Sequence, residues 1–406
     1  MRNDNTISKT SNVLLVLGQP DASHDHLAHV IDHFCGRVIG SLAELDESSP
    51  KHLTICGDLG LLPHVPKGSR VIRELSSNIP SGDSAPTAIG VGRVPLLVHD
   101  VGVFYRRFFD QENLFERIQS EHQFQQLTES TKQSKALRTG IYLTDVTREL
   151  DRERRELLHF RLLRCSSNLT GPTDNFRDTD RMIMGALNTA AGEVFAQEAC
   201  LNHVLAQIYT NTRDADERGR ERKAKISAHS DKTKDMREEG LIAFCTFYDS
   251  AGFQHLKPSS ADPYDWCHGR TSGLTRLHFK RKSTVEEDPT QVAEFSVTLY
   301  PNSVFIIPLS TNRLYTHAIR PSLLNVDRIP TRMGYVARCS QAEALFMDGQ
   351  TYLKKDGALV KLESMTRETL ADLRRSYYQE NSTDAVVRYG EVHFSMNAGD
   401  YQKPIH

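Results

Sequence analysis

Between Cys200 and Cys339 the chain consists mainly of short apolar segments separated by turn-forming residues, and this pattern constrains the fold more than any other feature. Segments of about four to eight residues that are rich in β-branched and aromatic side chains are typical of strands. We expect strands at 200–209, 241–248, 274–282, 293–300, 304–308 and 333–339. Runs of strands without helices between them favour an antiparallel sandwich or barrel over a doubly wound sheet.

The first part of the chain has a different texture. Residues 12–17 read as a buried strand and residues 23–34 as a helix, which together predict a small α/β domain over residues 1–100. Further strands are expected at 52–56, 69–72 and 94–99. Gly57 and Gly60 follow one of them, but neither a Gly-x-Gly-x-x-Gly nor a Gly-Lys-Ser/Thr motif is present. The pattern therefore does not predict a nucleotide site, and the role of this domain stays open.

A length of 406 residues is enough for two or three domains. After the first domain we expect a larger, strand-rich core domain over residues 101–355, followed by a C-terminal helical extension over residues 356–406. Apolar residues at helical spacing predict helices at 111–127 and 179–197 within the core. The charge-rich residues 146–159 are compatible with either a helix or a loop.

Composition and charge limit the classes of protein to which this chain can belong. Hydrophobic residues make up 38% and the formal net charge is −2, which is ordinary for a folded protein and argues against a wholly basic nucleic-acid-binding surface. Apolar runs stay well below the roughly 18 residues of a membrane helix. Seven cysteines are scattered singly, an odd number that does not fit a disulfide framework. We expect a soluble intracellular protein, not bound to a membrane, with reduced thiols.

His229 and Asp231 form the first candidate functional site. Side chains alternate along a strand, so residues two apart point to the same side and could share one metal ion. The His-x-Asp pair alone is common by chance. About 90 residues later, however, His317 offers a third ligand, and Arg332 and Arg338 follow with a six-residue spacing that places them on one face of a strand.

This ordered set of residue types points to oxygen chemistry. Two histidines and one carboxylate leave three open positions on an octahedral iron(II), enough for a bidentate keto acid and O2. A dianionic keto acid also needs cations at the far end of its pocket, and the planar fork of arginine suits a carboxylate. Arg332 and Arg338 meet that requirement.

At this point the chain resembles the AlkB-like iron(II)/2-oxoglutarate dioxygenases over roughly residues 104–345. That family has an Asn-x-Tyr strand, then His-x-Asp, then a distal His in an Arg-Leu-x-x-His-x-Ile-x-Pro context, and finally Arg-x5-Arg. Residues 313–321 match the third element, and residues 332–338 match the fourth. Tyr209 stands in the tyrosine position of the first element, with Gln207 where the family has Asn.

The resemblance implies a double-stranded β-helix (jelly-roll) core with flanking helices, so that the expected fold class is α+β. It implies iron(II) bound by His229, Asp231 and His317, and 2-oxoglutarate bound by Arg332, Arg338, Tyr209 and Gln207. The implied reaction converts 2-oxoglutarate and O2 into succinate and CO2 while a substrate C–H bond is hydroxylated. On an N-methyl group, hydroxylation releases formaldehyde and leaves the demethylated amine.

The substrate implied by the resemblance is a modified, methylated nucleobase or nucleic acid, and such a base must be single-stranded or flipped out of a duplex. The family's acidic residue two positions after the Asp ligand is replaced here by Thr233, with Asp235 two further on. This departure favours an alternative, a hydroxylase of a small molecule or a protein side chain. A catalytically silent binding protein is a third possibility, and the intact ligand set counts against it.

Two further groups of residues bear on a nucleic-acid substrate. A basic strand could track phosphates, or it could be a solvated edge strand: Arg276, His278, Lys280, Arg281 and Lys282. Several aromatic side chains are candidates for lining a base pocket: Tyr142, Phe176, Phe253, Tyr264 and Trp266. The sequence does not rank these candidates, and it leaves the oligomeric state open.

Overall fold

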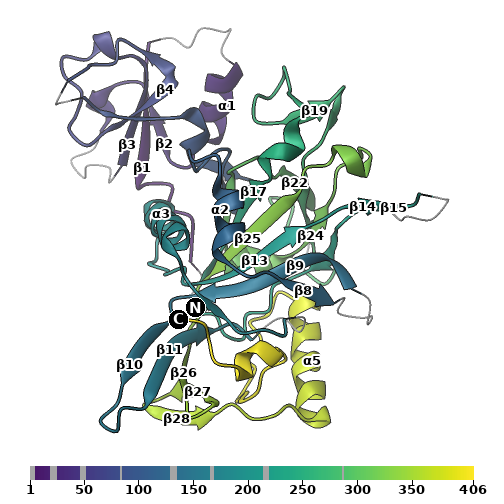
Figure 1. Ribbon diagram of the computed structural model, residues 1–406. Helices are drawn as coiled ribbons and strands as arrows, with labels where there is room; N and C mark the ends of the chain where they lie inside the picture. Colours follow the sequence, from purple (N-terminus) through teal and green to yellow (C-terminus); the bar gives the residue numbers. More distant parts are fainter. Residues whose placement is uncertain are drawn as a thin grey trace.

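The computed structural model describes residues 5–18, 25–45, 52–82, 85–128, 135–164, 169–213, 219–285 and 288–406. Within these ranges the protein is a mixed α+β structure, rich in sheet and with few helices. Figure 1 shows an N-terminal sheet at the top, a central pair of sheets, and a smaller sheet with helix α5 at the bottom. The expected α+β class is confirmed at this level.

The N-terminal sheet is wholly parallel and has five strands. Their order is β2 (Arg37–Ile39), β1 (Asn12–Leu17), β3 (His52–Asp58), β4 (Arg70–Ser77) and β5 (Thr87–Ile89). Helix α1 (Asp25–His33) contributes Leu27 and Val30 to the core that covers one face. The start of the predicted helix at 23–34 lies outside the described residues. The domain boundaries predicted above stay a prediction.

The large central sheet runs from β12 to β6, and its pairings are antiparallel except for that between β12 and β9. Its strands in order are β12 (Asp174–Asn175), β9 (Lys135–Thr144), β13 (His203–Tyr209), β25 (Arg332–Arg338), β17 (Leu241–Tyr248), β23 (Val304–Pro308), β7 (Gly102–Tyr105) and β6 (Leu96–Val98), with β8 (Gln125–Thr128) beside β9. The strands predicted at 241–248 and 304–308 are confirmed.

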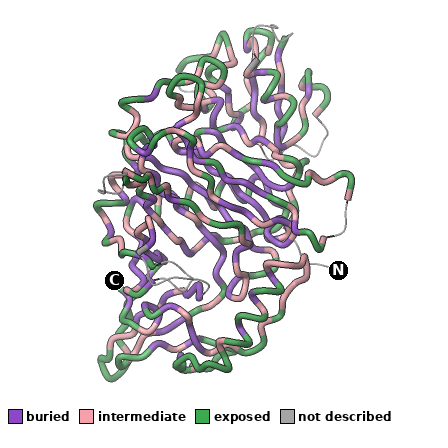
Figure 2. The backbone as a smooth tube through the Cα atoms, turned by 90° about the vertical axis from the view of Figure 1, so that its right-hand side faces the viewer, coloured by how far each residue is buried: buried purple, intermediate pink, exposed green. Residues whose placement is uncertain are grey.

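The outer face of this sheet is covered by α2 (Leu114–Glu121) and α3 (Asp178–Val194). Because side chains alternate along each strand, one set faces these helices. That set includes Val204, Phe247 and Tyr335, which belong to one apolar core with residues of both helices. In Figure 2 these central strands are coloured as buried along most of their length.

The inner face packs against a four-stranded sheet with the order β16 (Ile226–His229), β24 (Tyr315–Arg320), β21 (Arg276–Arg281) and β22 (Glu294–Thr298). Phe244 and Phe305 of the large sheet share a core with Phe279 and Phe295 of the smaller one. The two sheets therefore form a β-sandwich core. Helix α4 (Leu309–Leu314) connects β23 to β24.

A third sheet lies below the sandwich, in the order β10 (Thr147–Leu150), β11 (Glu156–Leu162), β26 (Ala342–Met347), β27 (Gln350–Lys355) and β28 (Ala358–Lys361). Helix α5 (Arg367–Ser382) follows it. Two small sheets complete the described strands. One pairs β14 (Thr212–Arg213) with β15 (Glu221–Arg222), and the other has the order β18 (Lys257–Pro258), β19 (Trp266–His268) and β20 (Thr271–Ser272).

Two local predictions are wrong. Residues 146–159 were expected to form a helix or a loop, but most of them belong to the hairpin β10–β11. Leu158 and Phe160 of β11 enter a core with β26, a strand far along the chain that the local charge pattern could not reveal. The helix expected at 111–127 ends at Glu121, because the chain turns extended at His122.

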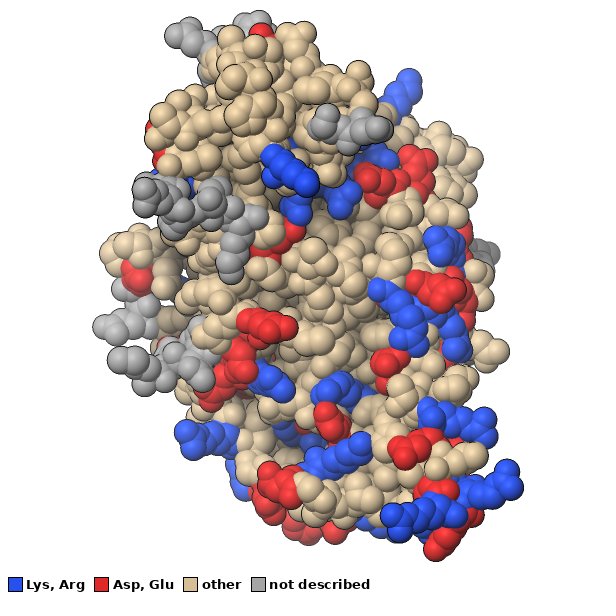
Figure 3. Space-filling view, turned by 90° about the vertical axis from the view of Figure 1, so that its left-hand side faces the viewer, with Lys and Arg blue, Asp and Glu red and all other residues tan. Residues whose placement is uncertain are grey.

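The structure also bears on the cysteines and on membrane association. Cys35, Cys56, Cys245 and Cys339 are buried free thiols, and Cys165 lies outside the described residues. Among the helices that the structure describes, none has the length and apolarity needed to cross a membrane. On the face shown in Figure 3, acidic and basic side chains alternate over the lower half of the molecule.

Candidate metal centre

His229, Asp231 and His317 lie together at one end of the sandwich, with their ligand atoms within 4.8 Å of one another. His229 and His317 are directly opposite each other on the antiparallel strands β16 and β24. The Nε2 atoms of the two histidines are 3.6 Å and 3.7 Å from Oδ1 of Asp231. The three residues predicted from sequence therefore form a candidate metal site, converging on one carboxylate oxygen.

Asp231 reaches this position by a route that differs from the expected one. Strand β16 ends at His229, so the backbone of Asp231 lies beyond the strand ladder. The side chain of Asn312 takes the place of strand pairing for this residue. It accepts a hydrogen bond from Asp231 N and donates one to Asp231 O, both at 2.8 Å. The second carboxylate oxygen, Oδ2, accepts from Arg338 Nε at 2.7 Å. Oδ1 is left facing the histidines.

The protonation states suit metal binding. Burial would raise the pKa of Asp231, but the charge of Arg338 outweighs it and holds the pKa well below its usual range. Burial, with repulsion from His229, lowers the pKa of His317 to about 3. The centre therefore offers an ionised carboxylate and a neutral imidazole at neutral pH, which are the forms that bind metals.

The tautomer of His229 is also fixed. Its Nδ1 lies 2.9 Å from the carbonyl oxygen of Ser227, so this nitrogen carries the proton and donates it. In the neutral form of the ring, that bond places the lone pair on Nε2, the nitrogen that faces Asp231. Metal-binding histidines commonly donate their other ring nitrogen to a carbonyl in this way.

Arg332 lies further along the same inner face, opposite Tyr209 in the register of β13 and β25. Its guanidinium stacks over the Tyr209 ring, 4.2 Å from the ring centre. Gly334 makes room for the stack, since a Cβ at that position would meet Arg332 Nη1 at 3.0 Å. The Tyr209 hydroxyl donates to Gln207 Oε1 at 3.0 Å, so the structure brings Gln207 into the same group.

A cavity of about 1090 Å³ joins these residues. All seven predicted site residues line it: Gln207, Tyr209, His229, Asp231, His317, Arg332 and Arg338. Side chains that the sequence reasoning did not assign to the site line it too, among them Phe244, whose ring is 5.3 Å from that of His317. No local signal marked Phe244. Asn312 directly precedes the motif at residues 313–321, but its bonds to the Asp231 backbone could not be inferred from the sequence.

Other predicted groups lie elsewhere. The basic strand at 276–282 is β21, which sits between β24 and β22 and is therefore not an edge strand. Lys282 is buried and donates to the carbonyl oxygen of Glu380, while His278 pairs with Glu294. Of the aromatic candidates, Phe253 and Trp266 pack against each other at 4.7 Å.

A second group of metal-ligand residues contains Glu121, His122 and Asp180. Both ring nitrogens of His122 are already engaged, Nδ1 with Asp174 and Nε2 with Asp180, each at 2.8 Å. Burial would lower the pKa of His122, but the hydrogen bonds to the two carboxylates raise it to about 9. This histidine is charged at neutral pH and has no lone pair for a metal, so the group is a structural ion cluster.

Comparisons with known proteins add little to this geometry. No family model matches the chain, and no curated protein matches it. Among solved structures the chain is similar to one described as "The structure of OsALKBH1", with 11% sequence identity and a TM-score of 0.33. That match covers 58% of this chain and 96% of the other. At this level the likeness is weak, so function is argued below from the site itself.

Proposed function

We propose that this protein is an iron(II)- and 2-oxoglutarate-dependent dioxygenase of the AlkB-like type, with a double-stranded β-helix core. The substrate that we propose is a methylated nucleobase in single-stranded or flipped form, which the enzyme would hydroxylate and thereby demethylate. The observation that carries the chemistry is a buried arginine with unpaired donors in the same cavity as the His-Asp-His centre.

That arginine is Arg332, which is 4% exposed. Its Nε and Nη2 donate no hydrogen bond to any residue that the structure describes. An unpaired buried guanidinium is costly, because it loses its hydration without gaining a partner. A carboxylate such as the far end of 2-oxoglutarate would satisfy both donors, since the guanidinium fork matches carboxylate geometry.

The residues divide the work of the reaction between them. His229, Asp231 and His317 would hold iron(II), which when bound supplies the oxidation of 2-oxoglutarate by O2 to succinate and CO2, with one oxygen atom passed to the substrate. Arg338 fixes Asp231 by binding the carboxylate oxygen that faces away from the histidines. Arg332 and Tyr209 would orient the co-substrate.

Charge around the cavity supports a polyanionic substrate. Besides the site arginines, the cavity is lined by six cations: Arg138, Arg220, Arg222, Lys223, Lys225 and Lys232. The one acid in the 220–225 segment, Glu221, pairs with Arg213. This local excess of positive charge contrasts with the mixed charges of the face in Figure 3 and with the net charge of −2 for the whole sequence. Lysine and arginine in such a position neutralise phosphates.

A second candidate, a hydroxylase of a small molecule or a protein side chain, is favoured by a different observation. The acidic residue expected near the base is replaced by Thr233 and Asp235, and both of these line another cavity. Asp235 is buried in an ion pair with Arg164 at 2.7 Å. Neither side chain therefore supplies the family's acidic contact.

The co-substrate site is tested by Arg332→Gln, assayed for succinate formation from 2-oxoglutarate with iron(II). A charge-assisted pair is worth about 1.5–3 kcal/mol, so we expect KM for 2-oxoglutarate to rise about 10- to 100-fold. Arg328→Gln is the matched control, because Arg328 is an exposed arginine just before the same strand. An unchanged KM in Arg332→Gln would contradict the proposed co-substrate site.

The substrate class is tested separately, by formaldehyde release from methylated single-stranded oligonucleotides. Demethylation that weakens steeply with added salt is expected, because phosphate contacts release counterions. Succinate formation without any base demethylation would instead support the second candidate.

A further inference from the structure

We propose that the C-terminal helix α5 is a positioning element of the metal centre, in which Glu380 and Asn381 hold the loop that carries Asp231. The inference rests on the proposed function for the identity of the metal site. It assigns a role to a part of the chain, residues 367–382, that the motif pattern does not reach.

The two residues bind the loop on either side of Asp231. Asn381 Oδ1 accepts a hydrogen bond from Ser230 N at 2.8 Å. Glu380 Oε1 accepts one from Thr233 N, also at 2.8 Å, and a second from the Thr233 hydroxyl. The last turn of α5 therefore takes up backbone donors one residue before and two residues after the metal ligand.

Further hydrogen bonds fix Glu380 and the end of α5 in place. Lys282, directly after β21 of the smaller sandwich sheet, donates to the carbonyl oxygens of Glu380 and Thr383, at 2.6 Å and 3.0 Å, so the end of the helix is anchored to the core. The Tyr389 hydroxyl donates to the other oxygen of Glu380. Glu380 is 2% exposed, and a buried carboxylate with several donors is rigid.

Lys232 adds a third contact between loop and helix. Its ammonium lies 4.2 Å from the centre of the Tyr377 ring, one turn before Asn381. The Tyr377 carbonyl accepts from Asn381 Nδ2 at 2.9 Å, which fixes the orientation of that amide. The amide oxygen of Asn381 is thereby directed to Ser230 N.

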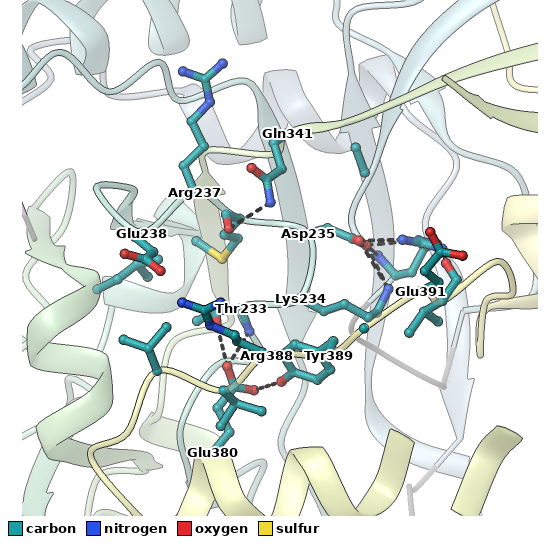
Figure 4. Close-up of a pocket in the computed structure, with 18 of the residues that line it drawn as sticks. Thr233, Lys234, Asp235, Arg237, Glu238, Gln341, Glu380, Arg388, Tyr389 and Glu391 are labelled. Carbon is teal, nitrogen blue, oxygen red and sulfur yellow. Dashed lines mark hydrogen bonds and ion pairs between the residues drawn. The ribbon is translucent and has the colours of Figure 1, made fainter. Parts of the chain in front are cut away.

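The loop and the end of α5 form a wall between two cavities. Lys232 and Asn381 line the metal cavity, whereas Thr233 and Glu380 line a neighbouring cavity of about 670 Å³. Figure 4 shows this second side, with Thr233 bonded to Glu380 and Glu380 bonded to Tyr389. The bonds matter for Asp231 because β16 has already ended, so strand pairing does not hold the loop.

The test is a Co(II) titration by calorimetry, with the metal as a redox-stable probe, on the full-length protein and four variants. Asn381→Ala and Glu380→Ala each remove a loop acceptor, and we expect the Kd for Co(II) to rise by about 10- to 100-fold. Glu380→Gln keeps an oxygen acceptor for Thr233 and should stay close to the parent protein. Gln379→Ala is the matched control, an exposed position on the same turn.

The outcomes separate this inference from the function on which it rests. If the parent protein binds no Co(II), the proposed metal function fails. If it binds Co(II), and Asn381→Ala and Glu380→Ala bind it as tightly, α5 does not position the centre and the inference is wrong. Melting of the metal-free proteins shows which variants remain folded, and Asn381→Ala decides the matter if Glu380→Ala does not fold.

Discussion

Among the residues that the structure describes, two largely buried groups of histidine and carboxylate side chains look alike in composition but differ in chemistry. One holds His229 and His317, on the smaller sandwich sheet, with Asp231 in the loop after β16. The other holds Glu121 and His122, at the end of α2, and Asp180, in the first turn of α3. In the first, burial and a neighbouring histidine lower the pKa of His317 to about 3. In the second, two carboxylates outweigh burial and raise the pKa of His122 to about 9.

The difference comes from the partners of the carboxylates. Arg338 neutralises Asp231, and burial together with the charge of His229 keeps the pKa of His317 low. Asp174 and Asp180 instead bind both nitrogens of one imidazole and keep it charged. A metal site needs neutral imidazoles with lone pairs, so an arginine beside the aspartate favours a metal, and a second carboxylate favours an ion cluster.

The largest expected effect comes from His229→Ala. It removes a proposed metal ligand whose side chain is 39% exposed, so the fold should be retained while Co(II) binding and succinate formation fall by at least about 100-fold. The matched change in the other cluster, His122→Ala, should leave the Co(II) affinity of folded protein unchanged. Equal losses of Co(II) affinity in both variants would erase the distinction between the clusters.

The second effect is on stability. His122→Ala removes the cation between Asp174 and Asp180, and loss of one partner of a buried ion pair costs about 3–5 kcal/mol. We expect the free energy of unfolding in urea to fall by that amount. Gln123→Ala, at the exposed neighbouring position, should change it little. A loss below about 1 kcal/mol in His122→Ala would show that the cluster contributes little to the fold.

The smallest effect is the pH dependence of that contribution. The pKa of His122 is about 9 in the folded protein, above its ordinary value of 6.5, so its stabilisation is complete below about pH 6.5 and is lost as pH rises through 9. The difference in unfolding free energy between the parent protein and His122→Gln should therefore shrink from pH 6.5 to pH 9. If the difference in unfolding free energy grew over this range, folding would lower the pKa of His122 instead of raising it.

Much of the fold was predictable wherever local pattern and burial agree. Strands such as Leu241–Tyr248 are continuous apolar runs and were found with their ends correct. Prediction failed at β10–β11, because all four residues of β10 are exposed and the partner strand β26 lies far along the chain. The helix prediction also failed at His122, where the helix has ended and the imidazole bonds to Asp174 and Asp180, which are distant in the sequence.

The candidate site shows the same division. The order of the residues, from Tyr209 through His229 to Arg338, was predicted from the resemblance to a family with the same ordered motifs, and these residue types would suit iron and a keto acid. The structure places all seven predicted residues around one cavity, and their roles there stay a proposal. Phe244 and Asn312 were missed, because the local sequence does not indicate which distant residues these two side chains contact.

The sequence by itself determined the strand-rich pattern, which depends on residue types at short spacing, and the set of possible ligands, which depends on residue types and their order along the chain. Only the tertiary structure decided which histidines are neutral, since burial and charge depend on neighbours in space. It also placed Glu380 and Asn381 against the loop of Asp231, about 150 residues away in the chain. Hydrogen bonds across such a separation leave no local pattern, because any polar side chain can accept from a backbone amide that folding brings within reach.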